Sequence, residues 1–507
     1  MALNSIVSWL MKKRIHQIEL FEKYPHDVQR EIFERLLSSA KNTEWGNHYG
    51  YSEISTPDEF KRRVPVQKYE SISPYIDRMM KGEQNLLWPT EIKWFAKSSG
   101  TTSSRSKYIP VSKEALEECH YKGGKDLVAL YYHNNPEAAL YNGKTLAMGG
   151  SSSVNVFRDD SYTGDLSAIM LKNLPLWVEF KRIPDRDLAL HDNWEEKIER
   201  MAQSTRKENV TNITGVPSWT LVLLKRILEI EGKADIKEVW PNLELFMHGG
   251  VSFKPYEPQY RALISGKMNY YQSYNASEGY FGIQDQNDAD DMLLMLDYGI
   301  YYEFMPLDEL GKDFPKTLEL HEVETNTNYA VIISTNGGLW RYMIGDTIKF
   351  SNLDPYRIVV SGRTKHFINA FGEELIIENA EEGLDAACKA TGATITDYTA
   401  GPIYMNDDHP SGHEWLIEFE QEPENLEKFI DVLDQKLKAI NSDYDAKRSN
   451  DLSMGRPSVR PLPSGTFYQW LKNKNKLGGQ NKIPRLSNDR TYLDEILEQV
   501  LEQTDAP

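Results

Sequence analysis

Short apolar or aromatic runs alternate with helical stretches from about residue 90 to residue 350. Runs of this kind, separated by helices, are typical of the strands of an α/β sheet. They lie at residues 94–96, 145–148, 243–247, 300–305 and 329–334. The chain of 507 residues is also far longer than one typical domain. We therefore expect an α/β fold with a large sheet domain and at least one further domain.

The two ends of the chain follow different patterns. Before residue 60, apolar side chains at helical spacing predict helices; they are Ile15, Ile18, Leu20 and Phe21, then Val28, Ile32, Leu36 and Leu37 after Pro25. Residues 415–419 alternate like a half-buried strand, residues 426–440 present one apolar helix face, and residues 450–465 read as a proline-containing loop. We predict a large domain over 1–361 and a smaller, mobile α+β domain over 362–507.

Charge and composition exclude several classes of function. The formal net charge of -18 would repel a phosphate backbone, so nucleic acid is not an expected partner, although a few local cations would suffice to bind ATP. No run approaches the roughly 20 apolar residues that cross a bilayer. The order of apolar and basic residues at the start does not fit a secretory signal, and two cysteines are too few for a disulfide framework. We expect a cytoplasmic protein that does not bind membranes.

A turn rich in hydroxyl groups follows the first predicted strand. It reads Lys97-Ser98-Ser99-Gly100-Thr101-Thr102-Ser103-Ser104-Arg105-Ser106-Lys107. Hydroxyls and backbone N–H groups in such a turn can surround phosphate oxygens, and Arg105 and Lys107 add positive charge. The segment lacks the Gly-Lys-Ser/Thr ending of a Walker loop. A solvated turn without a ligand is the alternative.

Two further segments combine a carboxylate with glycine and aromatic residues. In the segment 274–282, Glu278 in a glycine-flanked loop can hold Mg²⁺, and the neighbouring aromatic faces can stack a base. In the segment 340–347, Asp346 follows Gly345, and an ionised aspartate suits the paired hydroxyls of a ribose. Ordinary turns with core aromatics remain the alternative for both.

The order of these motifs along the chain is more informative than any one of them. After them come Ser361-Gly362-Arg363-Thr364-Lys365 and, late in the chain, Gln480-Asn481-Lys482-Ile483-Pro484-Arg485. This series resembles the acyl-adenylate-forming superfamily, which includes acyl-CoA synthetases, adenylation domains and luciferases. Within it, the motifs look most like those of the GH3 acyl-acid amido synthetases. The resemblance implies a two-domain adenylate-forming fold.

The resemblance also implies a role for individual residues. Thr101, Glu278 and Lys482 would be catalytic, and Glu278 would also be the Mg²⁺ ligand. Lys365 would be the hinge between the domains. The nucleotide would be bound by Ser98, Ser99, Gly100, Thr101, Thr102, Lys107, Gly249, Gly250, Tyr274, Ser277, Asp346 and Arg363. Two alternatives stay open: His248 could be a core histidine, and Lys482 an exposed surface lysine. Ser103 and Ser104 stand where the family loop often has a second glycine.

The activity implied is ATP-dependent. A carboxylic acid would be activated as its acyl-AMP with release of pyrophosphate, and the acyl group would pass to an amine, in particular an amino acid; ATP and Mg²⁺ are the implied cofactors. Residues 148–154 and 214–219 are candidates for the acyl pocket, with ordinary packing as the alternative. An acyl-CoA ligase and a nucleotide-binding protein without turnover are the rival interpretations.

Overall fold

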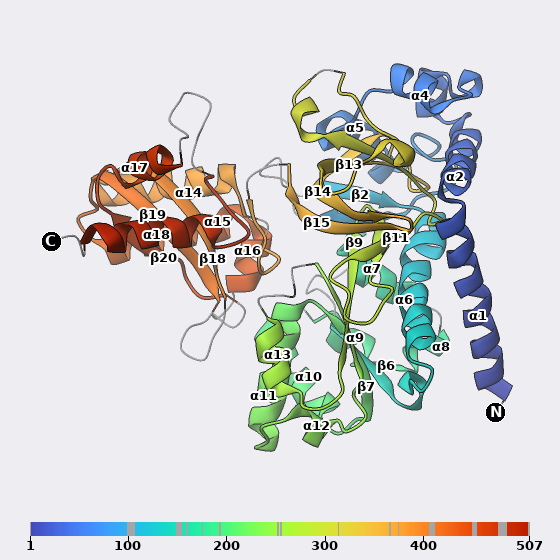
Figure 1. Cartoon of the computed structure of the whole chain (residues 1–507), viewed down its shortest axis with the longest axis horizontal. Helices are drawn as coiled ribbons and strands as arrows, with labels where there is room; N and C mark the ends of the chain where they lie inside the picture. Colours follow the sequence, from blue (N-terminus) through green and yellow to red (C-terminus); the bar gives the residue numbers. More distant parts are fainter. Residues whose placement is uncertain are drawn as a thin grey trace.

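Two lobes of unequal size make up the chain. The computed structural model describes residues 2–98, 107–148, 155–158, 161–174, 176–191, 194–250, 253, 256–312, 314–364, 367–373, 375–404, 411–448, 454–474 and 484–504. Figure 1 shows the smaller lobe, with α14 to α18, lying to one side of a larger lobe that holds the rest. This arrangement confirms the predicted α/β class with a large N-terminal and a smaller C-terminal part.

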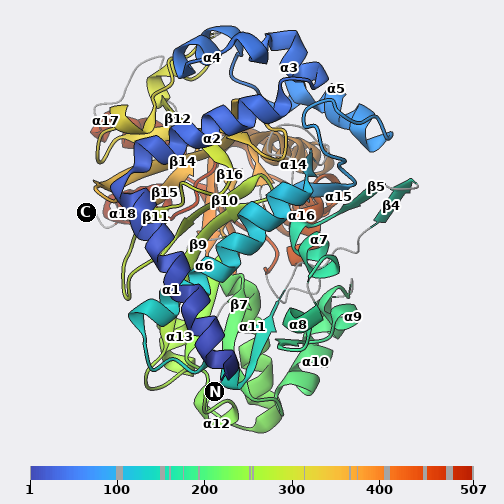
Figure 2. The same ribbon diagram turned by 90° about the vertical axis from the view of Figure 1, so that its right-hand side faces the viewer.

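Helices begin the larger lobe, as predicted. They are α1 (Ala2–Lys23), α2 (Pro25–Ala40), α3 (Glu44–Tyr49), α4 (Pro57–Arg63) and α5 (Tyr69–Met80). Pro25 takes the first position of α2, where its missing N–H costs nothing. The predicted apolar side chains are buried in the core, apart from Val28, which is half-buried, and Leu20, which is exposed. In Figure 2, α1, α2 and α6 (Tyr121–Asn134) cross the face of the larger lobe that is turned away from the smaller lobe.

An eleven-stranded sheet forms the centre of the larger lobe, in the order β12-β13-β14-β15-β11-β10-β9-β8-β7-β3-β6. Its strands are β3 (Lys144–Ala147), β6 (Arg182–Ile183), β7 (Val210–Gly215), β8 (Leu245–Gly249), β9 (Asn269–Ala276), β10 (Gly279–Ile283), β11 (Met292–Leu294), β12 (Ile300–Pro306), β13 (Asn328–Thr335), β14 (Tyr342–Leu353) and β15 (Tyr356–Arg363). From β6 to β9 the strands are parallel, and beyond β9 they are antiparallel. The runs predicted as strands within this lobe are strands.

Smaller elements complete the larger lobe. A second sheet has the order β2-β1-β5-β4 and contains β1 (Trp94–Ser98), β2 (Lys107–Val111), β4 (Asn155–Arg158) and β5 (Ser161–Gly164). The remaining helices are α7 (Leu166–Lys172), α8 (Leu176–Glu179), α9 (Arg186–Ala189), α10 (Trp194–Thr205), α11 (Pro217–Glu231), α12 (Ile236–Val239) and α13 (Glu257–Leu263). None of the helices in the described ranges combines the length and the apolar character that crossing a membrane requires.

The smaller lobe packs helices on a three-stranded sheet, with a two-stranded sheet beside it. Its elements are β16 (Phe367–Ile368), β17 (Leu375–Ile376), α14 (Ile377–Thr391), β18 (Thr394–Ile403), β19 (Gly412–Gln421), α15 (Leu426–Ile440), α16 (Ser442–Arg448), β20 (Ser458–Leu462), α17 (Thr466–Asn473) and α18 (Thr491–Thr504). The helix predicted for residues 426–440 is confirmed as α15.

Two expectations for the smaller lobe were wrong in part. The strand predicted for residues 415–419 exists within β19, but both of its faces are buried, because Trp415, Ile417 and Phe419 pack into one hydrophobic cluster and Leu416 packs into another. The stretch 450–465 contains a strand, β20, where we expected a loop. Pro461 is tolerated there because β20 lies at the edge of the sheet.

The lobes are joined by packed aromatic and charged side chains. The Tyr256 hydroxyl of the larger lobe donates a 2.9 Å hydrogen bond to the carbonyl oxygen of Ala370, and its ring lies 6.0 Å from that of Tyr404. The ammonium group of Lys447, from α16, lies 3.7 Å from the centroid of the Trp219 ring on α11. The domain boundary at residue 362 stays a prediction; it falls near the end of β15.

A buried ion pair holds the turn between β13 and β14. The guanidinium of Arg341 donates to both carboxylate oxygens of Glu303, with distances of 2.8 and 2.9 Å, and the two side chains are 3% and 1% exposed. The same guanidinium also donates to the carbonyl oxygens of Lys61 and Val64. Arg341 adopts a φ of 43°, an unfavourable value for a residue other than glycine. These bonds therefore fix the start of β14, the strand that carries Asp346.

Replacement of Arg341 should destabilise the larger lobe. Arg341→Met leaves the carboxylate of Glu303 buried without its cation, which typically costs about 3–5 kcal/mol. We expect a lower urea midpoint for Arg341→Met, partial recovery in the double variant Arg341→Met/Glu303→Gln, and no change for the exposed control Arg62→Met. Equal midpoints for Arg341→Met and wild type would contradict this account of the turn.

Candidate active site

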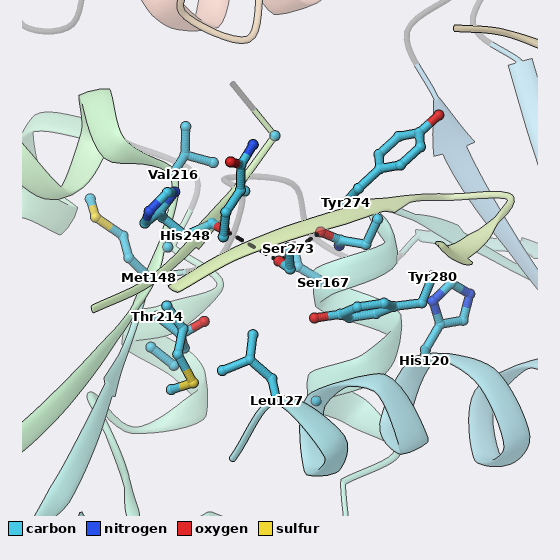
Figure 3. Close-up of a pocket in the computed structure, with 18 of the residues that line it drawn as sticks. His120, Leu127, Met148, Ser167, Thr214, Val216, His248, Ser273, Tyr274 and Tyr280 are labelled. Atoms are coloured by element: carbon cyan, nitrogen blue, oxygen red, sulfur yellow. Dashed lines mark hydrogen bonds between the residues drawn. The ribbon is translucent and has the colours of Figure 1, made fainter. Parts of the chain in front are cut away.

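One large cleft, with a volume of about 1960 Å³, is lined by both lobes. The larger lobe contributes residues from α6, α7 and the strands β3, β7, β8 and β9, and the smaller lobe contributes residues near 370 and from α16. The cleft brings together eight of the residues selected from the sequence: Ser98, Lys107, Gly249, Gly250, Tyr274, Ser277, Glu278 and Asp346. Figure 3 shows part of this cleft, with Tyr274 and Tyr280 beside Ser273.

The two ends of the hydroxyl-rich turn meet at the cleft. β1 and β2 are antiparallel partners, and Ser98 is paired with Lys107. The side chain of Lys107 is buried, and its ammonium group lies 5.5 Å from the centroid of the Tyr69 ring. A desolvated cation in this position can attract a phosphate strongly. Ser99, Gly100, Thr101 and Thr102, between these ends, lie outside the described residues.

The glycine pair at the end of β8 allows close approach to the cleft wall. A Cβ on Gly249 would lie 2.6 Å from the carbonyl oxygen of Ser273, so no side chain fits there without movement of β9. Gly250 has a φ of 82°, in the region that favours glycine. Both glycines line the cleft and leave a backbone surface against which a flat ring can lie.

A hydrogen bond connects two of the candidates directly. The Tyr274 hydroxyl on β9 donates to Oδ2 of Asp346 on β14, at 2.7 Å and in a buried environment. Gly345, just before Asp346, has a φ of 100° and accepts a hydrogen bond from the Thr364 N–H. An aromatic ring and a carboxylate are thus held next to each other on the cleft wall. That pairing suits a base and its ribose, as the sequence motifs predicted.

Ser277 and Glu278 form the two-residue turn between β9 and β10, because Ala276 pairs with Gly279. Both residues are half-buried and line the cleft. Across the described ranges, there is no group of three or more His, Cys, Asp or Glu side chains that could hold a metal ion. A magnesium ion at Glu278 would therefore need oxygen ligands from water and from substrate phosphate, as is usual for Mg²⁺.

His248 sits in an aromatic cluster at the cleft wall. Its ring stacks on Phe253 with centroids 4.3 Å apart, and Phe246 lies on β8 beside it. Burial lowers the pKa of His248 to about 3, so the imidazole is neutral at pH 7. This environment fits the alternative that we left open from the sequence, a core histidine, although the side chain also borders the cleft.

One further candidate that the structure describes, Arg363, lies at the end of β15. The backbone of Arg363 pairs with that of Asp346 across β14 and β15. Lys365 and Lys482 lie outside the described residues, so their predicted roles stay predictions. Met148 and the segment 214–216, two parts of the suggested acyl pocket, do line the cleft, and residues 149–154 are outside the described ranges.

Several residues that line the cleft were not selected from the sequence. His120 on the helix before α6, Tyr280 on β10 and Lys447 on α16 are three of those that are also buried; others with polar side chains are Asp126, Arg182, Asn212 and Gln284. Tyr280 stands two residues after Glu278, and this spacing could have identified it. His120 and Lys447 belong to no motif, and only the folded chain brings them to the cleft.

Comparison of folds places this architecture among the adenylate-forming ligases. The chain resembles the solved structure of 2-hydroxyisobutyryl-CoA ligase in complex with 2-HIB-AMP and CoA, with a TM-score of 0.56 and 13% identity over 95% of this chain and 93% of that one. It also resembles the AtGH3.15 acyl acid amido synthetase in complex with 2,4-DB, with a TM-score of 0.63 and 18% identity over 97% of this chain and 96% of that one.

Sequence comparison then identifies the family. The GH3 family N-terminal domain matches residues 14–268, the GH3 family central domain matches 293–363, and the GH3 family C-terminal domain matches 378–491. The indole-3-acetic acid-amido synthetase GH3.3 of Arabidopsis thaliana is 22% identical over 549 residues, which cover 93% of this chain and 91% of that protein. The chain belongs to the GH3 family.

The hydroxyl of Tyr274 should matter for nucleotide affinity. Tyr274→Phe keeps an aromatic face for the adenine but removes the donor that orients Asp346. A hydrogen bond to a charged group is worth about 1.5–3 kcal/mol, so we expect the KM for ATP to rise about tenfold or more. The measurement is ATP-dependent turnover at saturating acid. Tyr270→Phe, on the same strand and also at the cleft, should leave the KM unchanged. An unchanged KM in Tyr274→Phe would argue against the ribose site.

Proposed function

We propose that this chain is an ATP-dependent acyl-acid amido synthetase. It adenylates a carboxylic acid, releases pyrophosphate and transfers the acyl group to the amine of an amino acid. The observation that carries the proposal is the convergence of eight candidates, from β1 to β14, on one cleft between the lobes. Family membership supports it, since several relatives, such as the jasmonoyl--L-amino acid synthetase JAR4 of Nicotiana attenuata, are named as enzymes that join an acid to an amino acid.

The nucleotide occupies the end of the cleft near β9 and β14. Its adenine lies between the ring of Tyr274 and the backbone of Gly249 and Gly250, and its ribose hydroxyls bond to Asp346. The phosphates reach the turn between β1 and β2, where Lys107 supplies positive charge. The bond from Tyr274 to Asp346 supports this placement, because it holds the ring and the carboxylate in one orientation before ATP arrives.

Adenylation needs positive charge more than it needs a base. The acid's carboxylate attacks the α-phosphorus of ATP, so two anions approach each other and the leaving pyrophosphate gains charge. Magnesium held at Glu278 would screen this charge. Lys482, in the smaller lobe, would contact the carboxylate and the α-phosphate once the lobes close, and Lys365 would be the hinge of that motion.

The acyl group and the amine use the rest of the cleft. The apolar side chains of Leu127, Met148 and Val216 border a region beside the proposed nucleotide site (Figure 3). Water excluded from this region would protect the acyl-AMP from hydrolysis. The amine enters where the lobes meet and attacks the acyl carbon, which frees AMP.

Pyrophosphate exchange tests the first half-reaction. We expect incorporation of labelled pyrophosphate into ATP only when a suitable carboxylic acid is present. Lys482→Ala should lower this exchange by about 10²-fold or more, because the charge it screens develops in the transition state, while ATP binding changes little. Lys472→Ala replaces an exposed lysine of α17 and should behave as wild type. Equal losses of exchange and of ATP binding in Lys482→Ala would point to a structural role.

Acceptor specificity tests the second half-reaction. With an acid that supports exchange, amino acids should stimulate AMP formation and yield an amide of the expected mass. Coenzyme A should not stimulate it. AMP formation with coenzyme A and not with any amino acid would replace this proposal by an acyl-CoA ligase. ATP binding without exchange across a broad panel of acids would replace it by nucleotide binding without turnover.

A further inference from the structure

A π-helical turn brings His120 to the cleft. The π-helix Ala115–His120 runs directly into α6, and such turns are uncommon and often found at functional sites. The turn is fixed to the central sheet, because the backbone N–H of Tyr280 on β10 donates to the Cys119 Sγ at 3.1 Å. His120, the next residue, lines the cleft, and Figure 3 shows it beside Tyr280.

Gly123 allows the ring of Tyr280 to lie close to this part of the helix. A Cβ at Gly123 would stand 2.5 Å from two atoms of the Tyr280 ring, so a larger residue would displace the ring. Tyr280 and His120 therefore form one wall of the cleft. Leu127 from the next turns of α6 continues the wall with carbon atoms.

The imidazole of His120 has a ring nitrogen that forms no hydrogen bond with the part of the chain that the structure describes. The residue is 2% exposed, and its Nδ1 is buried with no hydrogen-bond partner among the described residues. An unsatisfied buried polar atom costs free energy, so a native structure that keeps one usually has a reason. Burial lowers the pKa of His120 to about 4, which leaves the ring neutral at pH 7 with one donor and one acceptor nitrogen.

We propose that His120 contacts the acyl substrate and selects an acid whose apolar body carries an uncharged hydrogen-bonding group, such as a hydroxyl. This inference rests on the proposed function, since it assigns the substrate class of the same cleft. The apolar wall would hold the body of the acid, and the imidazole would bond to its polar group. A second carboxylate is disfavoured there, because a neutral ring cannot compensate a buried charge.

Selectivity between paired acids tests the proposal. We would measure carboxylate-dependent pyrophosphate exchange with 3-phenylpropanoic and 3-(4-hydroxyphenyl)propanoic acid, and with hexanoic and 6-hydroxyhexanoic acid. Wild type should prefer the hydroxy acid of at least one pair by about tenfold or more in kcat/KM, because a site built to bond a hydroxyl rejects the analogue that lacks it. His120→Phe keeps an aromatic ring without nitrogen and should reduce this ratio to about one.

Two control variants distinguish a role of His120 in selecting the acid from a role in maintaining the fold. His120→Gln retains a hydrogen-bonding group and should keep part of the preference, and it serves as the readout if His120→Phe folds poorly. His133→Gln makes the same change on an exposed turn of α6 and should keep the wild-type ratio. The proposal would be overturned if the ratio of kcat/KM between the paired acids were equal in wild type and His120→Phe. It would also be overturned if wild type preferred adipic acid to both hexanoic and 6-hydroxyhexanoic acid.

Failure of the proposed function would have a different signature. If no acid supports exchange in wild type, the same acid pairs can be titrated calorimetrically into the protein with AMP present. If wild type binds a hydroxy acid more tightly than its partner and His120→Phe loses this preference, the result would still support the contact between His120 and the acid. Equal binding of both members of each pair, or no binding of any acid, would refute it.

Discussion

The hydrogen bond between Tyr274 and Asp346 requires a curled central sheet in the larger lobe. These residues belong to β9 and β14, and β10, β11 and β15 lie between the two strands in the sheet. Four steps across a flat sheet would separate the strands by about 19 Å, far beyond the reach of a tyrosine and an aspartate side chain. The sheet must therefore curl between β9 and β14, across β10, β11 and β15. The curl makes one wall of the cleft from residues that are distant in sequence.

The sequence motifs could point to one shared wall because several of their residues lie at or next to the ends of strands, whereas Tyr274 and Asp346 lie within β9 and β14. Ser98 ends β1, Gly249 ends β8, and Ser277 and Glu278 form the turn after β9. Strand ends are fixed by backbone hydrogen bonds, so residues at these ends are placed with little dependence on side-chain packing. The apolar runs identified most of these strands, because a short run of buried apolar side chains leaves little alternative to a strand.

Other features depend on tertiary contacts that a local pattern does not contain. The segment 415–419 was predicted to expose one face, yet Glu418 is buried within it and Glu414 is buried just before it. The carboxylate of Glu414 accepts hydrogen bonds from Arg460 and Arg490, and that of Glu418 accepts from the backbone N–H groups of Gly465 and Phe467. These partners lie 46 or more residues away in sequence. β20 was missed because its prolines are typical of loops, and only an edge position permits them. His120 likewise reaches the cleft through a π-turn, which has no recognisable sequence signal.

Charged, neutral polar and apolar side chains all line the cleft, as the proposed chemistry requires. The chain carries a net charge of -18, but exposed charges are screened beyond about 10 Å, so the nearest groups decide what binds. Lys107 at the phosphate turn and Lys447 at the lobe junction are both buried cations that line the cleft. His120 and His248 also line the cleft and are kept neutral by burial, whereas Asp126, Glu278 and Asp346 add carboxylates to the same lining. The buried cations can attract the anionic groups of a substrate, and apolar side chains such as Leu127 and Met148 leave room for an acyl group, where a mixed anhydride would be shielded from water.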